Sequence, residues 1–368
     1  MTDVVHRLPR GERFGARSVD GGRYTQPETL SREIEQVFKR GWVVACTAAA
    51  VDKPGSVAVL REQGVDVVVT RDTHGQLRAF HNRCMHRGSR LAQGCGQHAD
   101  LTCGYHGWRY GLDGEVKFSP GADGFGGIDV SKMRLKSVRV EASCGLVWVC
   151  LDVEQAALSE AMAGIASELE PYKLGQMEPI QERVFDLPVN WKVMLENAFD
   201  FYHVAQVHPA SVHAHVNTPP ERVVYGDHQR QNIHIAPYAW RRFIDARCSR
   251  GGPYTEKQRS QLFKYTLFPN TIINVLPYHL TVMRVWPDGT DRCRLHYGFY
   301  QRRGARGLEW LRARGTWLAS RVILAEDVRM LVRCQTGMDA EVVPQHLLHD
   351  HEAASAHFHQ VLGAWLGD

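Results

Sequence analysis

The chain has 368 residues, 44% of them hydrophobic, which is enough for one large domain or two ordinary domains with substantial cores. Its 44 lysines and arginines against 40 aspartates and glutamates leave a formal net charge of +4, spread along the chain. Because no basic segment stands out, we do not expect nucleic acid as a partner. No apolar run reaches the roughly 18 residues that a membrane-spanning helix needs, so we expect no membrane span.

The N-terminal stretch is polar and contains no apolar signal-peptide core, which favours a cytoplasmic location. In that reducing compartment the nine cysteines are expected to be free thiols or metal ligands rather than disulfides. The spacing of cysteines and histidines is therefore the feature of this sequence that bears most directly on its chemistry.

An amphipathic helix is predicted for residues 28–41, because Leu30, Ile34, Val37 and Phe38 recur at helical spacing and form an apolar stripe. The sequence then changes to short β-rich runs separated by Gly, Pro, Asp and His, a pattern typical of an all-β module. These predicted strands are 65–70, 77–81 and 144–152.

Further along the chain, helical stretches alternate with strand-like runs, which predicts a mixed domain of helices and antiparallel sheet. The predicted helices are 158–169, 191–206 and 307–333, and the predicted strands are 271–276, 280–286 and 293–300. We therefore predict an α+β fold in three parts. Residues 1–41 form a segment that packs on the last domain, 42–155 form the all-β domain, and 156–368 form the helix-and-sheet domain.

Neither a G-x-G-x-x-G after a strand nor a G-x-x-x-x-G-K-[ST] motif is present. The glycine-rich residues 121–127 match neither pattern. The chain is therefore not expected to bind a nicotinamide, flavin or nucleotide of its own.

The first candidate metal site consists of two Cys–His pairs, Cys84-x-His86 and Cys103-x-x-His106. Two thiolates and two imidazoles suit a tetrahedral zinc ion. They suit equally a two-iron, two-sulfur cluster in which one iron takes both thiolates and the other takes both imidazoles. The spacing alone leaves both possibilities open.

A second C-x-x-H pattern, Cys95-Gly-Gln-His98, lies between these pairs and offers a rival for either ligand. We interpret Cys95 and His98 as exposed loop residues.

Another candidate site follows about a hundred residues later. On a continuous helix Asp200 lies one turn before His203 and shares its face with Glu196, Phe199 and Val207. An isolated H-x4-H pair, such as His203 and His208, is more often a pair of ordinary polar residues than a metal site.

The position of His208 depends on the residue that follows it. His208 would point away from His203 on an unbroken helix. Pro209 disfavours α geometry at the residue before it, so we expect the helix to end or bulge there and His208 to lie beside His203. His213 and His215 are further histidines nearby.

The residues around the first site resemble the Rieske non-haem iron oxygenases, whose signature is C-x-H-R-G, then about sixteen residues, then C-P-Y-H-G-W-x-Y. This chain has C-M-H-R-G at 84–88 and C-G-Y-H-G-W-R-Y at 103–110. It differs at Gly104, where the family usually has proline, and we expect a more flexible loop with unchanged ligands.

The resemblance implies a [2Fe-2S] cluster, with four ligands: Cys84, His86, Cys103 and His106. Imidazole ligands raise the potential above that of an all-thiolate cluster. The glycines of the signature would let backbone N–H groups approach the bridging sulfides.

The second candidate site, Asp200-x-x-His203-x4-His208 with Asn197 before it, matches the second motif of the same family. The resemblance implies that both histidines bind a mononuclear Fe(II) together with one carboxylate from a late helix. In the family, the carboxylate that matches Asp200 links a cluster histidine of a neighbouring subunit to an iron histidine. Applied here, Asp200 links His106 to His203 across a subunit interface, and this implies a homotrimer.

The late helix is expected in 317–337, and Asp327 lies in the middle of its apolar stripe. A carboxylate there needs a partner, and a metal ion supplies one. Glu326 is expected to face Arg329 and Arg333 as a solvated ion-pairing residue, so we favour Asp327 over Glu326 as the third iron ligand.

Two more carboxylates lie near the end of this helix. The helix is predicted to stop at Gly337, so Asp339 and Glu341 lie past its end and are poorer candidates. The stripe around the favoured carboxylate comprises Trp317, Ser320, Ile323, Leu324, Met330, Leu331 and Cys334.

The resemblance covers nearly the whole chain and implies a terminal oxygenase that activates O2 at Fe(II) with electrons relayed by the cluster. The expected outcome is dihydroxylation, monohydroxylation or oxidative demethylation of a small aromatic or methylammonium substrate. Electrons would come from NAD(P)H through a separate reductase, with or without a ferredoxin. The oligomer would be a homotrimer, or a hexamer with an added small subunit. The alternatives are a Rieske-type electron carrier and a zinc-stabilised binding protein.

The substrate pocket is expected between the late helix and the strands at 271–286 and 293–300. Aromatic walls would suit either a planar ring or a quaternary ammonium group. The candidates are Phe199, Tyr202, Tyr238, Trp240, Tyr278 and Trp286. For any single one of them, ordinary core packing is the more frequent role.

Overall fold

The structure is a computed structural model that describes residues 5–8, 18–213, 216–235, 261–276, 279–339 and 342–368. The described chain forms two compact units. The small unit comprises Phe38–Glu160, and the large unit comprises the described residues up to Val37 and from Ala161 to Asp368. The boundaries expected after residues 41 and 155 lie within five residues of these.

The small unit is built from short antiparallel strands in three sheets, of order β6-β5-β4-β7, β10-β9-β8 and β11-β12-β3. The strands are β3 (Val43–Thr47), β4 (Ser56–Glu62), β5 (Val65–Arg71), β6 (Leu77–His81), β7 (Gly96–Gln97), β8 (Leu101–Thr102), β9 (Arg109–Tyr110), β10 (Val116–Phe118), β11 (Arg139–Ser143) and β12 (Leu146–Cys150). Strands β5, β6 and β12 confirm the three that were predicted in this region.

A two-residue turn joins β4 to β5, because Glu62 pairs with Val65 across it. Gly64 supplies the positive φ, 80°, that such a hairpin turn needs. The core beneath these strands includes Val57, Val68 and Phe80. It also includes the thiols and rings of the predicted cluster motif, namely Cys84, Cys103, Trp108 and Tyr110.

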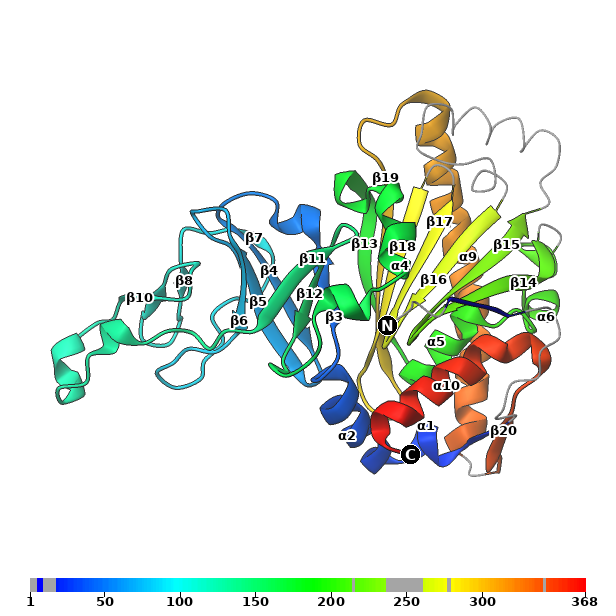
Figure 1. Cartoon of the computed structure of the whole chain (residues 1–368), viewed down its shortest axis with the longest axis horizontal. Coiled ribbons are helices and arrows are strands. Elements are labelled where there is room, and N and C mark those ends of the chain that lie inside the picture. The colour runs from blue at the N-terminus through cyan, green and yellow to red at the C-terminus, as the bar shows by residue number, and fades with distance from the viewer. Residues whose placement is uncertain (1–4, 9–17, 214–215, 236–260, 277–278, 340–341) are drawn as a thin grey trace. The chain divides into compact units, whose positions relative to one another are not determined.

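The large unit is organised around an eight-stranded antiparallel sheet of order β1-β14-β15-β16-β17-β18-β19-β13 (Figure 1). Its strands are β1 (Val5–Leu8), β13 (Met177–Leu187), β14 (Val216–Tyr225), β15 (His228–Ile235), β16 (Gln261–Leu267), β17 (Thr271–Leu276), β18 (His279–Pro287) and β19 (Cys293–Arg302). A separate two-stranded ribbon pairs β2 (Ser18–Asp20) with β20 (Gln345–Leu347). Strands β17, β18 and β19 confirm the predictions for this part of the chain.

The longest helix, α9, runs along the sheet (orange in Figure 1) and contacts β19, α5 and α6. The helices are α1 (Gly22–Thr25), α2 (Pro27–Glu33), α3 (Leu158–Ala161), α4 (Ile165–Leu169), α5 (Trp191–Phe199), α6 (Val204–Val207), α9 (Gly307–Asp339) and α10 (Ala353–Leu366). Short 3-10 turns occupy Ala48–Val51, Ala122–Phe125, Val130–Lys132, Glu170–Tyr172, Leu174–Gln176 and Asp350–Glu352. None of the helices described combines the length and the apolar character that crossing a bilayer requires.

Apart from the helix predicted for 191–206, which ends early at Phe199, three predicted helices differ from the observed ones. The N-terminal helix is α-helical only to Glu33 and continues as a π-helical turn over Ile34–Phe38. The stretch 158–169 is broken between α3 and α4, where Gly164 has a positive φ of 76° that favours glycine. The late helix passes through Gly337 and reaches Asp339, so the predicted stop is wrong.

A buried ion pair attaches the N-terminal helix to α5. The Lys192 ammonium lies 2.7 Å from Oε1 of Glu33, and the two side chains are 1% and 0% exposed. Trp191 donates its indole N–H to the other carboxylate oxygen of Glu33 at 2.8 Å. Burial lowers the pKa of Lys192, and Glu33 opposes that change. Because each charge is buried, either one alone would be strongly unfavourable.

We expect Glu33→Ala to lower the free energy of unfolding of the large unit by about 3–5 kcal/mol, since it leaves the ammonium buried without its carboxylate. Urea unfolding followed by tryptophan fluorescence measures this. The matched control is Glu28→Ala on the same helix, where the side chain is exposed. The control should change stability by no more than about 0.5 kcal/mol. Equal small losses of stability in both variants would contradict a stabilising role for the Glu33–Lys192 ion pair.

Candidate metal centres

The two loops of the cluster motif close in the same way. Gly88 and Gly107 each lie four residues after a cysteine and have φ angles of 72° and 73°. The Gly88 N–H donates to the Cys84 carbonyl at 2.8 Å, and the Gly107 N–H donates to the Cys103 carbonyl at 3.0 Å. A Cβ at Gly88 would meet no atom within 4 Å, so glycine is required there for its left-handed backbone rather than for space.

The thiols and the imidazoles of these loops lie in different environments. Cys84 and Cys103 are 3% and 2% exposed, whereas His86 is half-buried and His106 is exposed. The two imidazole rings are 4.7 Å apart. The Nδ1 atom of His86 is buried and has no hydrogen-bond partner within the described structure. An orphaned imidazole nitrogen beside a second imidazole, close to two buried thiols, fits an iron–sulfur cluster with mixed ligands.

The surroundings favour the ligand forms of both residue types. Burial would raise the pKa of Cys103, but the backbone N–H groups of Tyr105 and His106 lower it overall, which favours the thiolate. Burial, with the nearby His106 and Arg87, lowers the pKa of His86, which keeps its imidazole neutral. The backbone N–H groups of Tyr105 and His106 point at the Cys103 sulfur, where they stabilise negative charge.

Two aromatic residues of the motif complete the cradle. The Trp108 ring stacks on His86, with centroids 5.4 Å apart and planes 8° apart. The Tyr110 hydroxyl lies 3.2 Å from the Cys84 sulfur and accepts a hydrogen bond from the Met85 N–H. The rival residues Cys95 and His98 are both exposed, as predicted.

The second site begins where α5 ends. Asp200 leaves helical geometry with a ψ of 137°, directly after Phe199. The short helix α6 follows, with His203 at its N-cap and His208 at its C-cap. The predicted continuous helix to residue 206 is therefore wrong, and so is the helical face that Asp200 and His203 were expected to share. His208 is non-helical, as the following proline predicts.

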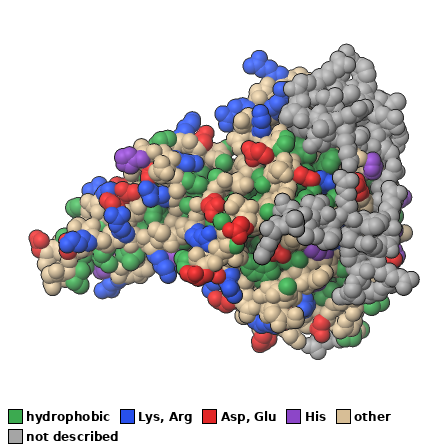
Figure 2. All heavy atoms as spheres, viewed as in Figure 1, with side chains coloured by type: hydrophobic (Ala, Val, Ile, Leu, Met, Phe, Trp, Pro, Cys, Tyr) green, Lys and Arg blue, Asp and Glu red, His purple; other side chains and the backbone are tan. Residues whose placement is uncertain are grey.

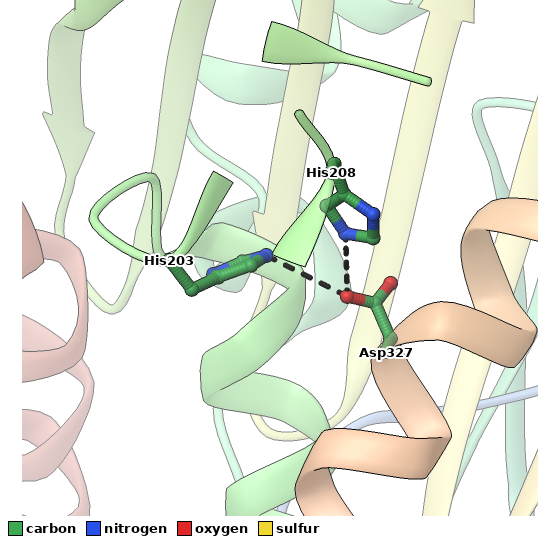
Figure 3. Close-up of side chains that lie close together, drawn as sticks. All are labelled: His203, His208 and Asp327. Atoms are coloured by element: carbon green, nitrogen blue, oxygen red, sulfur yellow. Dashed lines mark hydrogen bonds and ion pairs between the residues drawn. The ribbon is translucent and has the colours of Figure 1, made fainter. Parts of the chain in front are cut away.

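His203, His208 and Asp327 converge on one point (Figure 3). The Oδ1 atom of Asp327 lies 2.7 Å from Nε2 of His208 and 3.5 Å from Nε2 of His203. One ligand atom from each residue lies within 4.8 Å of the other two. Two imidazoles and one carboxylate with open positions suit a mononuclear Fe(II) ion.

The other nitrogen of each imidazole is held by a second carboxylate, Asp200 for His203 and Glu326 for His208. The Nδ1–H of His203 donates to Oδ2 of Asp200 at 2.8 Å. The Nδ1–H of His208 donates to Oε2 of Glu326 at 2.7 Å, and Ser211 donates to the same oxygen at 2.7 Å. The prediction that Glu326 is a solvated partner of arginines is therefore wrong. Neighbouring positions on α9 place Glu326 and Asp327 on the two nitrogens of one imidazole.

The electrostatics of this group fit a metal ion. Burial alone would lower the pKa of His208, but Asp327 and Glu326 raise it overall. Hydrogen bonds from Ser211 and His208 lower the pKa of Glu326. When each Nδ1 carries the proton, both Nε2 lone pairs and the Asp327 oxygen face one another. Such a set of acceptors is stabilised by a cation between them.

The three converging side chains open on a cavity of about 280 Å³ in the large unit. It lies between α9 and strands β17–β19, as predicted, and Asn197 and Asp200 also line it. The helix contributes Thr316, Ser320, Ile323 and Leu324, and these three strands contribute Asn274, Leu276, His279, Thr281, Met283, Tyr297 and Phe299.

Of the six predicted aromatic walls, the three that the structure describes do not line the cavity. Phe199 is fully buried and packs on Phe358, with ring centroids 5.9 Å apart. Trp286 is fully buried in the core, and Tyr202 is 55% exposed and stacks on His349. The other three candidates, Tyr238, Trp240 and Tyr278, lie outside the described residues.

The observed aromatic walls are Phe201, Tyr297 and Phe299. The two residues on β19 share one face because side chains alternate along a strand, and this alternation could have identified them. Lys264 on β16 also lines the cavity and was missed, because a lysine in a strand pattern carries no sign that it faces a cavity.

Two parts of the chain match models of known protein families. Residues 174–368 match the family model described as the ring hydroxylating alpha subunit (catalytic domain), and residues 41–137 match that of the Rieske [2Fe-2S] domain. The first match covers more than half of the chain. The chain therefore belongs to the ring-hydroxylating oxygenase alpha-subunit family and contains a Rieske [2Fe-2S] domain. The resemblance and the fold class inferred from sequence are confirmed.

Individual relatives cover different parts of the chain. The oxygenase subunit of glycine betaine monooxygenase from Chromohalobacter salexigens is 31% identical over 199 residues, which are 54% of this chain and 44% of that protein. The oxygenase subunit of carnitine monooxygenase from Acinetobacter baumannii is 23% identical over 282 residues, 75% of this chain and 74% of that protein. The large oxygenase component of the naphthalene 1,2-dioxygenase system from Pseudomonas aeruginosa is 35% identical over 195 residues, 50% and 43% respectively. The chain thus spans less than half of the length of two of these relatives.

Solved structures show the same fold. A quaternary ammonium Rieske monooxygenase, studied for carnitine oxidation and inter-subunit electron transfer, superposes with a TM-score of 0.82 at 20% identity, over 98% of this chain and all of that chain. Naphthalene 1,2-dioxygenase with indole in its active site superposes with a TM-score of 0.79 at 18% identity, over 98% and 95%. At these identities the likeness concerns the fold alone.

Substitution of the cysteines tests the first site. We expect Cys103→Ser to remove the EPR signal of low average g-value that marks a Rieske cluster, together with the acid-labile sulfide, since a buried thiolate ligand is lost. The matched control Cys95→Ser should keep both, because Cys95 is exposed. Loss of the signal in the control, or its survival in the first variant, would contradict the ligand set.

For the second site, Glu326→Ala should weaken iron binding by about 10–100-fold, because the imidazole of His208 loses the carboxylate that orients it. Titration of the iron-free whole chain with Fe(II) measures this affinity. Glu309→Ala is the control, since Glu309 lies on the same helix and pairs with Arg302. Iron affinity equal to that of the unmodified chain would show that Glu326 does not support the ligand.

Proposed function

We propose that this chain is the terminal oxygenase component of a Rieske-type system. In this proposal it is a mono- or dioxygenase that hydroxylates or oxidatively demethylates a small organic substrate, aromatic or methylammonium. The observation that carries the proposal is the second donor set, His203, His208 and Asp327, which opens on a cavity. A Rieske-type electron carrier needs only the small unit.

In the proposed enzyme the cluster is held by Cys84, His86, Cys103 and His106, and the mononuclear iron is held by His203, His208 and Asp327. When bound, the iron would supply O2 activation, with electrons that originate from NAD(P)H and pass through the cluster. The chain's own contribution is geometric. Three ligands on one side leave positions open toward the cavity, and Asn197 lines that cavity near the ligands.

Asp200 is proposed to orient His203 and to connect it to the cluster of a second copy of this chain. The 2.8 Å hydrogen bond to Nδ1 directs Nε2 of His203 at the metal position. The second carboxylate oxygen of Asp200 accepts from the Tyr202 N–H. In an assembled enzyme, His106 of the second copy would approach Asp200. We propose a homotrimer, or a hexamer with a small subunit.

The proposed partners are a small-molecule substrate and a separate reductase, with or without a ferredoxin. We propose no nucleic acid among them, because many lysines and arginines on the face shown in Figure 2 lie beside acidic side chains. Asp66 pairs with both Arg83 and Arg90, and Lys117 pairs with two carboxylates. The cysteines within the described ranges are free thiols, which suits a cytoplasmic location.

Oxygen uptake that depends on an added organic substrate and a surrogate reductase tests the proposal. In that assay Asp200→Asn should keep both metals but slow product formation by about 10–100-fold, because the orienting carboxylate is lost. Asp186→Asn is the matched control, since Asp186 is an exposed residue of the same unit, and it should turn over normally. Unchanged turnover in Asp200→Asn would rule out this role, and a purified protein with zinc in place of iron would rule out the oxygenase.

A further inference from the structure

Among the described residues, one lysine lines the cavity beside the proposed iron site. Strand β16 directs Leu262 and Lys264 into the cavity, and Phe263 between them is buried on the opposite face. The Lys264 ammonium donates to the carbonyl of Ala198. It also lies 5.0 Å from the centroid of the Phe201 ring, another wall of the cavity. This cation is therefore part of the cavity lining.

Lys264 begins a polar row that crosses three strands. The strand register places Lys264 opposite Asn274, and Asn274 opposite Thr281. All three side chains line the cavity. Asn274 donates to the Thr281 hydroxyl at 2.9 Å, which leaves the hydroxyl hydrogen of Thr281 able to donate onward. The amide oxygen of Asn274 is buried and has no partner in the described structure.

Apolar side chains surround this row. On the same sheet face Leu262, Leu276, Met283 and Phe299 line the cavity, and Ile323 and Leu324 line it from α9. In such surroundings the Lys264 ammonium has one neutral acceptor, the Ala198 carbonyl, and an anion would offset the cost of burying its charge. The cavity thus combines one polar strip with apolar walls, which is the arrangement that orients a ligand with one polar end.

The charge of Lys264 is not balanced by an ion pair. No carboxylate among the described residues lies within 4.0 Å of its ammonium. Burial lowers the pKa of Lys264 to about 8, and the charges of Asp327 and Asp200 oppose that change. The two nearby carboxylates are themselves engaged, since Asp200 holds His203 and Asp327 faces both histidines.

We propose that Lys264 is the anion subsite of this cavity and that the substrate is an organic carboxylate with an apolar body. This inference rests on the proposed oxygenase function and names its substrate class. The carboxylate accepts from the Lys264 ammonium and from the Thr281 hydroxyl. The apolar body lies along the remaining walls, toward the converging His203, His208 and Asp327. A substrate that carries only positive charge is disfavoured, because the Phe201 ring already faces a cation.

A purely structural role for Lys264 makes a different prediction. Ala198 lies in the last turn of α5, so the lysine also caps the C-terminal end of that helix. If capping were its sole role, loss of the charge would lower stability and leave ligand selection unchanged. The decisive measurement is therefore charge selectivity rather than stability.

The experiment is calorimetric titration of the metal-loaded chain at neutral pH with matched probes. The pairs are benzoate and benzamide, cinnamate and cinnamamide, and glycine betaine and choline. We expect at least one acid to bind about 10-fold or more tightly than its partner without the carboxylate, equivalent to about 1.4 kcal/mol. Lys264→Gln keeps a donor for Ala198 but removes the charge, and it should abolish this preference. Lys264→Arg keeps the positive charge and should therefore keep the preference for the acid.

Leu262→Met is the matched control, because it changes the shape of the cavity on the same strand without changing its charge. It should shift the affinities of acid and partner equally. The proposal is overturned if no acid in the panel binds better than its partner, or if the preference survives in Lys264→Gln. Oxygen uptake is scored separately. Charge-selective binding without turnover would contradict the oxygenase function alone, and turnover without charge selectivity would contradict this subsite alone.

Discussion

The imidazole of His208 lies between two consecutive carboxylates of α9, with Nε2 2.7 Å from Asp327 and Nδ1 2.7 Å from Glu326. This contact joins the segment after α5 to a helix that begins a hundred residues later. His203 reaches the same point because α5 stops at Phe199 and the chain turns before α6. The rest of the large unit holds these segments in place. The sheet supports α9, and the buried pair of Glu33 and Lys192 anchors the start of α5.

The small unit solves a different physical problem, because it must keep thiolates inside a core and imidazoles near the surface. Two loops with the same glycine-closed turn achieve this, each placing a cysteine inward and a histidine outward. Backbone N–H groups at Cys103 stabilise the thiolate, and the stacked Trp108 covers His86. The cluster site is thus formed mainly by local backbone geometry, whereas the iron site is formed by contacts between distant segments.

In this cavity, the residues that follow the family motif are different from those that would select the substrate. The proposed ligands His203 and His208 match the family motif, but the strip of Lys264, Asn274 and Thr281 arises from the register of three neighbouring strands of this chain. Oxygenase chemistry at one end of the cavity and an anion subsite on the sheet would together select an acid and present its apolar part to the metal. A quaternary ammonium monooxygenase and naphthalene 1,2-dioxygenase share the fold although their names give different substrates.

The sequence by itself determined the features that depend on neighbouring residues. These are the Cys–His loops at 84–88 and 103–110, the strands with alternating or β-branched residues, and the late helix that carries Asp327. Tertiary structure alone decided the break at Asp200, the partner of Glu326, the aromatic walls and the position of Lys264 in the cavity. Glu326 meets a residue 118 positions away, and no local periodicity reports such a contact. The break at Asp200 follows two carbonyls, of Ala198 and Phe199, that accept hydrogen bonds from Lys264 and Gln231, and such long-range contacts outweigh the local helical preference.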